Sequence, residues 1–538
     1  MKSKFPGIII GIAVAFCLLQ CAKKGMPEGG PKDEIPPRFI KSFPENYTTN
    51  FNKKEISILF DEFIKLENPQ QQIIISPPID PRPNIAPQGL ARKDIKIEIT
   101  DTLQENTTYT INFGKSIVDN NEGNSSPYFK YVFSTGSYID SLKVSGFVED
   151  SYLKETPPYV SVLLYEMDST YSDSVVYNKI PRYVSYTRDS SVNFNLENLK
   201  AGKYQMVAML DDNSNYKFNP KKDKIGFLDH PITIPTDSVY TISIFQEELP
   251  FDVKRPKLFK GNQLIVGYEG KLEIEDLDLN ILYPKIIAPT TRITRDAETD
   301  TLYYWFKEPI ENDSLSMEVV TSNQRDTVFV RMTDIPRDSL TISVEPNVNI
   351  AYNAPIFLKA NTPITEKNND LISILNKDSI PVPFTSEIKL IENEIVINFD
   401  KEESETYYFK ALPGAVIDLF EQTNDTLVKK FTTKAYSEFG SIAMNLRNVR
   451  SYPIIIQLTS TKEEVYREQT LTSGTSFEFK NIDPGEYYLR IIYDTNKNGK
   501  WDTGKWLERR KPEKISYYPD TLEVRANWDQ NYPAFYLD

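Results

Sequence analysis

The sequence predicts an all-β protein built from several β-sandwich domains in series. Short runs of alternating apolar residues recur along the chain, for example at 56–60, 95–99 and 395–399, and turn-forming Asn, Asp, Gly or Pro lie between them. No long segment has a convincing 3.6-residue apolar period, and 36 prolines interrupt the chain. A length of 538 residues is several times that of one domain, which indicates three to five domains.

Composition excludes several classes of function. The 76 acidic and 62 basic residues leave a net charge of −14, which argues against a nucleic-acid partner. The single histidine, His230, would have to serve any Ser-His-Asp or Cys-His triad, and multi-histidine metal sites are excluded. Carboxylate pairs could support glycoside hydrolysis, but the pairs at 61–62, 247–248 and 402–403 stand in no recognised glycosidase motif. We therefore predict a protein that is not an enzyme and has no catalytic residues.

The segment 1–20 is predicted to be a signal peptide that ends at a lipid-attachment cysteine. Lys2 and Lys4 precede an apolar run at 7–19 that is too short to span about 30 Å of hydrocarbon. The run ends in Leu18-Leu19-Gln20-Cys21, which resembles the lipobox of bacterial lipoproteins. This resemblance implies cleavage before Cys21 and acylation of its thiol. Gln20 departs from the usual small residue at its position, so an uncleaved signal anchor remains the alternative.

The residues after Cys21 suggest where the anchored protein works. Residues 21–35 are rich in Gly, Pro and charge and are predicted to be a tether between the lipid and the first domain. No later apolar run is long enough to cross a membrane, so no transmembrane helix is expected. We predict attachment to the outer membrane, at the cell surface rather than on the periplasmic face, although Lys23 and Lys24 do not distinguish the two.

Residues 36–136 carry a first domain signature. It consists of five segments at 42–46, 58–62, 103–110, 119–124 and 133–135. Together these segments resemble the bacterial Ig-like domain of the S-layer type. The resemblance implies a sandwich in which the strand of Tyr109 packs in the core and the Asp119 to Asn124 loop makes a tight turn. It implies an exported protein and no chemistry.

Residues 137–250 carry a second signature, which returns at 438–538. Its members are Phe194, Leu196, Asn198, Leu199, Gly202 and Tyr204, and each has a counterpart at one constant spacing along the chain, in Phe477, Phe479, Asn481, Ile482, Gly485 and Tyr487. A glycine turn that leads into a tyrosine-bearing strand resembles the transthyretin-like and carboxypeptidase-regulatory-like domains. We therefore predict a transthyretin-like β-sandwich in each of the two segments.

The Ig-like pattern also repeats, at 347–437. The repeat consists of residues that match those of the first domain: 406–407, 418, 424 and 431–433 match 108–109, 119, 124 and 133–135. The strand at 394–400 matches 55–61. A two-domain unit is thus predicted twice, around a middle β-sandwich at 251–346. Tandem sandwiches on a tether indicate a rod or an arc. Over most of its length the chain resembles Bacteroidota outer-membrane or surface lipoproteins with Ig-like domains.

One loop has the spacing of a calcium site. Asp494, Asn496, Asn498 and Asp502 occupy positions 1, 3, 5 and 9, with a glycine at position 6, and Lys500 at position 7 would offer its backbone carbonyl. Position 12 lacks the bidentate glutamate of a complete loop. Calcium is therefore the single candidate cofactor, and the alternative is a hairpin loop held by Asx turns.

These predictions favour a scaffold or interaction subunit of the envelope. The expected partners are the membrane, through the lipid, and an outer-membrane protein complex, for example one centred on a β-barrel that assists assembly of outer-membrane or surface proteins. A glycan-binding or adhesion lipoprotein is the alternative. It would need exposed aromatic side chains, whereas Trp501, Trp506 and Trp528 are expected mainly to fill sandwich cores.

Overall fold

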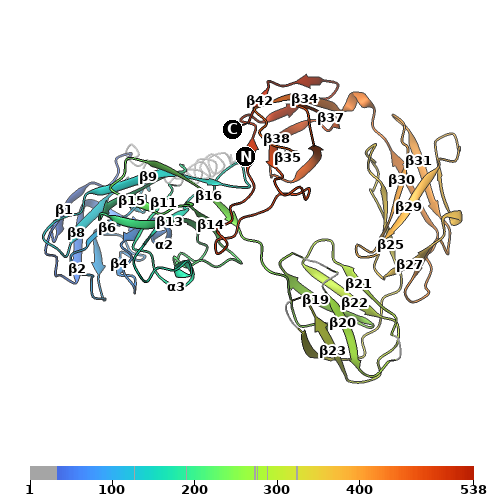
Figure 1. Ribbon diagram of the computed structural model, residues 1–538, viewed down its shortest axis with the longest axis horizontal. Helices are drawn as coiled ribbons and strands as arrows, with labels where there is room; N and C mark the ends of the chain where they lie inside the picture. The colour runs from blue at the N-terminus through green and yellow to red at the C-terminus, as the bar shows by residue number, and fades with distance from the viewer. Residues whose placement is uncertain are drawn as a thin grey trace, which may run out of the picture.

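The computed structural model describes residues 33–537, apart from 127, 189–190, 272–273, 275–276, 287–288 and 323–324. The predicted signal peptide, Cys21 and most of the tether lie outside these residues. The described chain forms five successive β-sandwiches, each around its own apolar core (Figure 1). The all-β fold class is confirmed. Within the described residues, no helix is long and apolar enough to cross a membrane.

The first sandwich packs two antiparallel sheets face to face. One has the order β1 (Phe39–Phe43), β2 (Glu55–Leu66), β5 (Arg92–Glu98) and β4 (Asn84–Ala86), with β7 (Ile117–Asp119) also on β2; the other is β3 (Ile74–Ser76), β6 (Thr108–Asn112) and β8 (Lys130–Ser134). Alternate residues of β2, such as Ile56, Ile58 and Phe60, are buried, as a period of two requires. Tyr109 and Phe133 stack in the core with their ring centroids 5.3 Å apart.

The fourth sandwich repeats this topology. Its strands are β25 (Ile342–Glu345), β26 (Ile356–Ala360), β30 (Glu394–Phe399) and β29 (Phe384–Lys389), then β27 (Ile364–Lys367) with β32 (Val416–Asp418), and β28 (Ile372–Leu375), β31 (Thr406–Ala411) and β33 (Leu427–Thr432). The order β25-β26-β30-β29 matches β1-β2-β5-β4, and β28-β31-β33 matches β3-β6-β8. β25 lies before residue 347, so this sandwich begins earlier than the predicted boundary.

One predicted correspondence within the repeat is wrong. β30 occupies the position of β5, whereas the sequence comparison placed residues 394–400 opposite 55–61 in β2. The counterparts of β2 are β26 and β27, which pair with β25 and β32 as β2 pairs with β1 and β7. β2 and β5 are adjacent central strands that bury alternate isoleucines in one core, so their patterns are interchangeable.

The second sandwich folds from one continuous, twisted run of eight paired strands. They are β9 (Leu142–Asp150), β10 (Ser161–Glu166), β11 (Tyr183–Tyr186), β12 (Asn193–Leu199), β13 (Gly202–Leu210), β14 (Lys224–Phe227), β15 (Ile232–Ile234) and β16 (Val239–Gln246), in the order β11-β10-β13-β14-β16-β9-β12 with β15 on β13. Two short helices, α2 (Pro69–Gln72) in the first sandwich and α3 (Val175–Asn178) in the second, are the described α-helical turns.

The fifth sandwich has the same pairings. Its strands are β34 (Gly440–Arg447), β35 (Ile454–Ser460), β36 (Val465–Leu471), β37 (Ser476–Ile482), β38 (Gly485–Tyr493), β39 (Ile515–Tyr517), β40 (Leu522–Val524), β41 (Asp529–Asn531) and β42 (Phe535–Tyr536). β38 pairs with β35, β39 and β40 as β13 pairs with β10, β14 and β15. In both copies the last strands run parallel to the first. Asn198 and Asn481 both have a left-handed φ, of 58° and 54°. The predicted repeat of the second sandwich in the fifth is therefore confirmed.

The third sandwich completes the predicted order. It packs β17 (Asp252–Val253), β19 (Gln263–Glu269), β22 (Thr301–Phe306) and β21 (Thr291–Arg295), with β18 (Lys257–Lys260) on β19, against β20 (Asp278–Tyr283), β23 (Ser314–Val320) and β24 (Arg325–Arg331). Leu264, Leu302 and Met317 are among the fully buried residues of its core.

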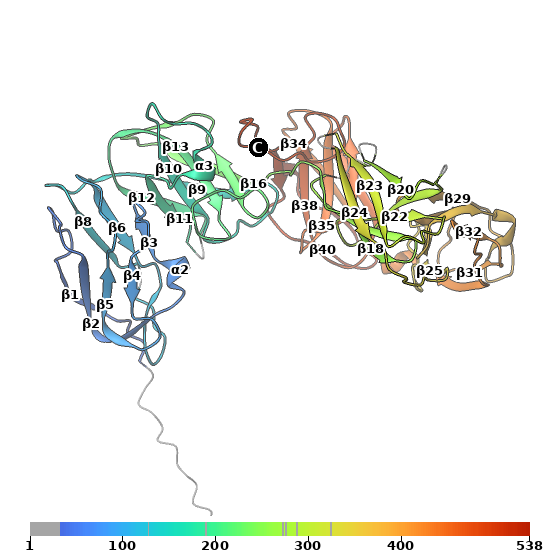
Figure 2. The same cartoon turned by 90° about the horizontal axis from the view of Figure 1, so that it is seen from below.

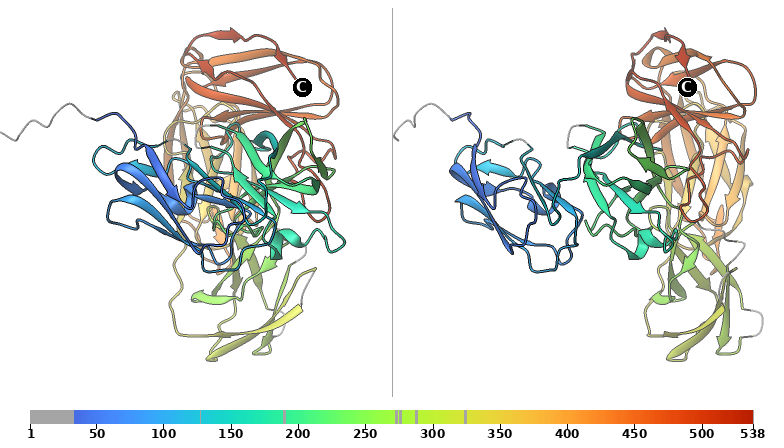
Figure 3. Two further views of the ribbon diagram at one scale, coloured as in Figure 1. Left: turned by 90° about the vertical axis from the view of Figure 1, so that its left-hand side faces the viewer. Right: turned by 60° about the vertical axis from the view of Figure 1, so that its left-hand side comes forward.

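The five sandwiches do not form an open rod. The chain runs from the second through the third and fourth sandwiches, and the fifth lies back against the second (Figures 1 and 3). The first sandwich lies at one end, with β3 and β6 against β11 and β12 of the second (Figure 2). The arc that tandem sandwiches indicate is therefore closed into a ring of four domains.

The predicted tight turn of the first sandwich is built around one buried carboxylate. Asp119 Oδ1 accepts hydrogen bonds from the backbone N–H groups of Asn121, Glu122 and Gly123, and Oδ2 accepts one from Asn124. Burial raises the pKa of Asp119, but these four donors together hold it below the usual value. The charged carboxylate therefore stabilises the first sandwich.

The Asp119 turn predicts a pH-dependent stability. Because its pKa is lower in the folded state, its stabilisation is present above the unfolded pKa and is lost as pH falls through the folded pKa. We expect Asp119→Ala to destabilise the first sandwich by about 2–4 kcal/mol at pH 7, with a smaller difference at acidic pH. Hydrogen exchange of β7 and β8 measures this. Exposed Asp101→Ala is the control, and a pH-independent difference would contradict the prediction.

Candidate functional site between the second and fifth sandwiches

The fifth sandwich is fastened to the second by the long loop between β38 and β39, residues 494–514. Trp506 in this loop is 0% exposed, although it lies in an apolar cluster that belongs to the second sandwich. That cluster covers the outer face of the strands β10, β13, β14 and β16 of the second sandwich. It includes Leu163, Val207, Phe227 and Phe245. The Trp506 ring stands edge-on to Phe227 with centroids 5.2 Å apart. The loop thus completes a core in another domain.

Polar contacts fix the orientation of the Trp506 side chain. Its indole Nε1–H donates to the backbone oxygen of Asp173 at 2.7 Å, and its backbone N–H donates to the Glu247 carboxylate at 2.6 Å. Three residues earlier, the Thr503 hydroxyl donates to the backbone oxygen of Gln246 at 2.5 Å. Burial raises the pKa of Glu247, and the N–H of Trp506 offsets part of that rise. Both N–H groups of Trp506 are therefore paired with acceptors of the second sandwich.

Arg509 packs against the tryptophan from the same loop. Its guanidinium lies 3.9 Å from the Trp506 ring centroid, which is a close cation–π contact. The same guanidinium holds the Asp173 carboxylate with both Nε, at 3.1 Å, and Nη2. The bidentate geometry is specific to arginine. Asp173 therefore accepts hydrogen bonds from the loop at two places, its backbone oxygen and its carboxylate.

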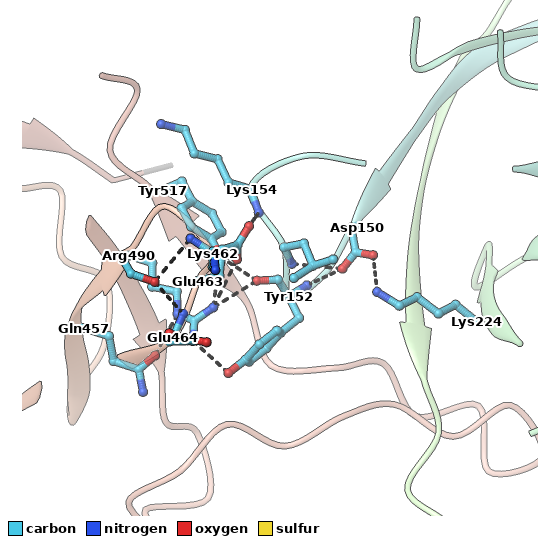
Figure 4. A network of polar contacts seen from close by, with 12 residues as sticks. Asp150, Tyr152, Lys154, Lys224, Gln457, Lys462, Glu463, Glu464, Arg490 and Tyr517 are labelled. Atoms are coloured by element: carbon cyan, nitrogen blue, oxygen red, sulfur yellow. Dashed lines mark hydrogen bonds and ion pairs between the residues drawn. The ribbon is translucent and has the colours of Figure 1, made fainter. Parts of the chain in front are cut away.

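A second fastening point lies across the same interface and centres on Arg490 of β38 (Figure 4). Its guanidinium is 0% exposed and donates to Gln457 at 2.7 Å, to the Tyr152 hydroxyl at 2.7 Å and to the Tyr517 hydroxyl at 3.0 Å. It also lies 3.5 Å from the Glu463 carboxylate and 4.2 Å from the ring centroid of Tyr152. Tyr152 comes from the second sandwich, so a buried charge of one domain is neutralised and packed at the interface.

The segment after β9 supplies the second sandwich's half of this network. The backbone N–H of Lys154 donates to Glu463 at 2.9 Å, and its ammonium group donates to the backbone oxygen of Pro519 at 3.0 Å. That ammonium also lies 4.4 Å from the ring centroid of Tyr488. The Tyr517 hydroxyl lies 2.6 Å from both the backbone oxygen of Tyr152 and the Glu463 carboxylate, and its single proton is donated to one of them at a time. Burial, followed by the hydrogen bond to Glu463, raises the pKa of Tyr517, so this donor stays protonated at neutral pH.

The repeat shows how the two copies diverged at this contact. Arg490 of β38 corresponds to Val207 of β13, and both lie on the outer face of their sheet. Val207 belongs to the apolar cluster that receives Trp506, whereas Arg490 carries the polar network. The loop after β38 spans 494–514, while the loop after β13 spans only 211–223. The extra length of the later loop, together with its tryptophans, is the sequence signal for the contact.

The predicted calcium loop forms the start of the same segment. Asp494 accepts the backbone N–H groups of Asn498 at 3.0 Å and Gly499 at 2.9 Å, and Asp502 accepts the side-chain amides of Asn496 and Asn498, both at 2.6 Å. These are Asx-type contacts that hold the loop without an ion. The described residues contain no cluster of three or more His, Cys, Asp or Glu side chains placed to hold a metal. The two amides would have to rotate to present oxygen, so calcium binding stays a prediction.

Calcium titration of the full chain tests this loop. Because Asp494 and Asp502 are the two charged ligands, Asp494→Asn is expected to weaken calcium binding by about tenfold or more. Isothermal titration calorimetry gives the affinity, and the thermal shift of the fifth sandwich gives an independent readout. Asp520→Asn, a change of equal charge at an exposed site outside the loop, is the control. No heat and no thermal shift at millimolar calcium would contradict calcium binding.

The other predicted residues are separate from the two fastening points. Trp528 is 50% exposed and pairs with Arg525 within the fifth sandwich, and His230 is exposed in a loop. Trp501 packs near Tyr152, with ring centroids 4.7 Å apart, and lines a cleft of about 510 Å³ between the two sandwiches. Sequence reasoning did not single out Tyr152 or Arg490, because each looks like an ordinary strand or turn residue.

Among the comparisons with known proteins, the family match agrees with the fold of the first sandwich. Residues 33–135, the first sandwich, match the bacterial Ig-like domain family. No curated protein sequence matches the chain. Among solved structures, the surface-layer protein SbsC, domains 1–6, is 12% identical and covers 91% of this chain and 67% of its own, with a TM-score of 0.16. Titin fragment I67–I69 is 12% identical over 46% of this chain and 95% of its own, with a TM-score of 0.12. A Dscam structure is 9% identical and covers 70% of this chain and 97% of its own, with a TM-score of 0.15. TM-scores this low carry no conclusion about function.

Proposed function

We propose that this protein is a non-enzymatic, lipid-anchored scaffold of the bacterial outer membrane that binds other proteins, as a subunit of a complex centred on a β-barrel. The observation that carries the proposal is the closed ring of four sandwiches. Tandem domains on flexible linkers sample many arrangements, whereas the burial of Trp506 and Arg490 between the second and fifth sandwiches fixes one. A fixed arrangement presents several surfaces at set distances, which is what a scaffold needs.

The proposed location rests on the N-terminus. An Ig-like sandwich fits a protein-interaction or adhesion role at the cell surface. Acylation of Cys21 would place the first sandwich next to the membrane, because the segment from Cys21 to Asp33 reaches at most about 40 Å when extended. The ring would then project away from the bilayer, and its net negative charge would keep it soluble there.

Three experiments test the proposal. Metabolic labelling with an alkyne fatty acid should modify the wild-type chain and not Cys21→Ala, and protease treatment of whole cells should degrade the protein if it faces outward. Cross-linking followed by purification from detergent-solubilised outer membranes should recover an integral β-barrel protein with it. Recovery of the protein alone, after cross-linking, would contradict the scaffold role.

Glycan binding or adhesion is a second candidate function. A specific observation favours it: a cleft between the first and second sandwiches is lined by aromatic and amide side chains. The two functions are compatible, since this cleft lies outside the contact that closes the ring.

A further inference from the structure

A cleft lies where the first and second sandwiches meet. Its volume is about 610 Å³. The first sandwich contributes Tyr47, Tyr128, Phe129 and other residues around β8, and the second contributes residues of β11 and β12 together with Arg188 and Ser191. Two residues of the lining, Lys130 and Glu197, join the two sandwiches through an ion pair at 2.6 Å. The cleft therefore has walls from both domains that are tied to each other.

Two tyrosines of this cleft are held in a costly backbone conformation. Tyr47 has φ 66° and Tyr128 has φ 52°, in the left-handed region that a bulky residue rarely adopts. Such a conformation is unfavourable for a bulky residue and is typically retained where it presents a side chain for binding. Tyr47 is 60% exposed, so its ring stabilises little of the fold. Both strained residues line the same cleft.

The repeated sandwich lacks two of these aromatic residues. β8 and β33 occupy equivalent positions, so Tyr128 and Phe129 correspond to Thr426 and Leu427. In the first of the two repeated units, β3 and β6 of the first sandwich lie against the second sandwich, and the cleft forms beside these strands. Phe129 packs on the core of the first sandwich, as Leu427 does on that of the fourth, so it serves the fold. Tyr128 is thus the aromatic residue that the copy with the cleft has gained, which is expected if it serves the cleft.

The remaining lining is polar and suited to hydroxyl groups. Asn193 and Asn195 of β12 are exposed, and each side-chain amide has an oxygen acceptor and two N–H donors. Asn195 already donates one N–H to Glu197, which leaves its oxygen and its second N–H for a ligand. The guanidinium of Arg188 lies 4.2 Å from the ring centroid of Tyr128 and adds further donors. The charged groups are Arg188 and the Lys130–Glu197 pair, so Arg188 leaves the lining with one net positive charge.

Strand addition by a peptide is disfavoured because the neighbouring backbone groups are already used. The backbone oxygen of Asn195 accepts the Ser185 hydroxyl at 2.8 Å, and the backbone oxygen of Lys130 accepts the Asn46 amide at 2.9 Å. The backbone N–H of Val132 donates to Asn46 at 2.8 Å. A ligand must therefore bind through side chains, whereas β-strand addition depends on main-chain hydrogen bonds.

We infer that this cleft binds an oligosaccharide. The exposed ring of Tyr47 and the face of Tyr128 turned away from Arg188 receive the C–H faces of sugar rings, and Asn193, Asn195 and Arg188 pair with the hydroxyl groups. The inference rests on the second candidate function, which it deepens by assigning a site. It is independent of the scaffold role, because none of these residues takes part in the contact between the second and fifth sandwiches.

The test uses the full chain with Cys21→Ser and three probe sets: neutral hexose oligomers, N-acetylhexosamine oligomers and uronic-acid oligomers. Saturation-transfer NMR and titration calorimetry should detect binding of at least one set. Tyr47→Asn and Tyr128→Asn should each weaken it by about tenfold, because the ring is lost. Asparagine accepts the left-handed conformation, so the melting temperature should not fall.

The control is Tyr408→Ala, which removes an exposed tyrosine from the fourth sandwich. It should leave sugar binding unchanged. Three results would overturn the inference: no binding of any of the three probe sets, binding that survives the Tyr47→Asn/Tyr128→Asn double variant, or binding in the cleft of a short acidic peptide but of no sugar. Each leaves the membrane-complex purification unaffected, so failure of the sugar site and failure of the scaffold role are distinguishable.

Discussion

Replacing Trp506 by alanine is expected to open the ring. The substitution removes a fully buried indole from the apolar outer face of the second sandwich and breaks its hydrogen bond to Asp173. Loss of a buried tryptophan costs about 3–5 kcal/mol, and here that cost falls on the contact between two domains rather than on the central core of either. The fifth sandwich should therefore detach while each sandwich stays folded. Small-angle X-ray scattering should show a larger radius of gyration with unchanged circular dichroism.

The matched control for this variant is Trp528→Ala. Trp528 is half exposed and lies in the same sandwich, so its loss should change neither the radius of gyration nor the stability by more than about 0.5 kcal/mol. Hydrogen exchange should locate the effect of Trp506→Ala at α3, β14 and β16, which contribute to the cluster around the indole. An unchanged radius of gyration together with unfolding of the second sandwich would show that Trp506 serves that domain alone.

Arg490→Ala is expected to be the most destabilising single change in the fifth sandwich. Removing the guanidinium takes a buried donor from Gln457 and from the hydroxyls of Tyr152 and Tyr517. It also removes the cation beside the Glu463 carboxylate, which keeps the backbone N–H of Lys154 as a donor. Removing one partner of a buried, hydrogen-bonded ion pair while the other stays costs about 3–5 kcal/mol. Chemical denaturation followed by hydrogen exchange of β35 and β38 measures the loss. A cost below about 1 kcal/mol would contradict this role for the network.

Two further variants test whether the loss comes from removing any positive charge of the fifth sandwich or from breaking its contact with the second sandwich. Arg525→Ala removes an exposed arginine that pairs with Glu523 within the same sandwich, and it should leave the stability nearly unchanged because solvent screens the pair. In the double variant Trp506→Ala/Arg490→Ala, the two losses should not add, because both side chains act in one closed state. Additive losses would mean that the two fastening points hold independently of each other.

The sequence predicted the parts of the fold that depend on local pattern. Alternation identified the strands, and the repeated second signature placed β13 and β38 in register, including Asn198 and Asn481 with their left-handed turns. It failed where two strands look alike: β30 was matched with β2 instead of β5, because both bury alternate isoleucines in one core. The 494–502 motif forms a loop held by Asx contacts, and its calcium binding stays a prediction.

By itself, the sequence determined that this protein is a series of β-sandwiches with a duplicated two-domain unit. A period of two and the turn residues are properties of neighbouring positions, so they can be recognised locally. Only the tertiary structure decided that the series closes on itself. Trp506 belongs to the fifth sandwich in sequence but fills an apolar cluster of the second. Arg490 has the sequence context of a solvent-facing strand residue but is fully buried. Burial at an interdomain contact depends on the fit of two surfaces that lie far apart in the sequence, and no local pattern encodes that fit.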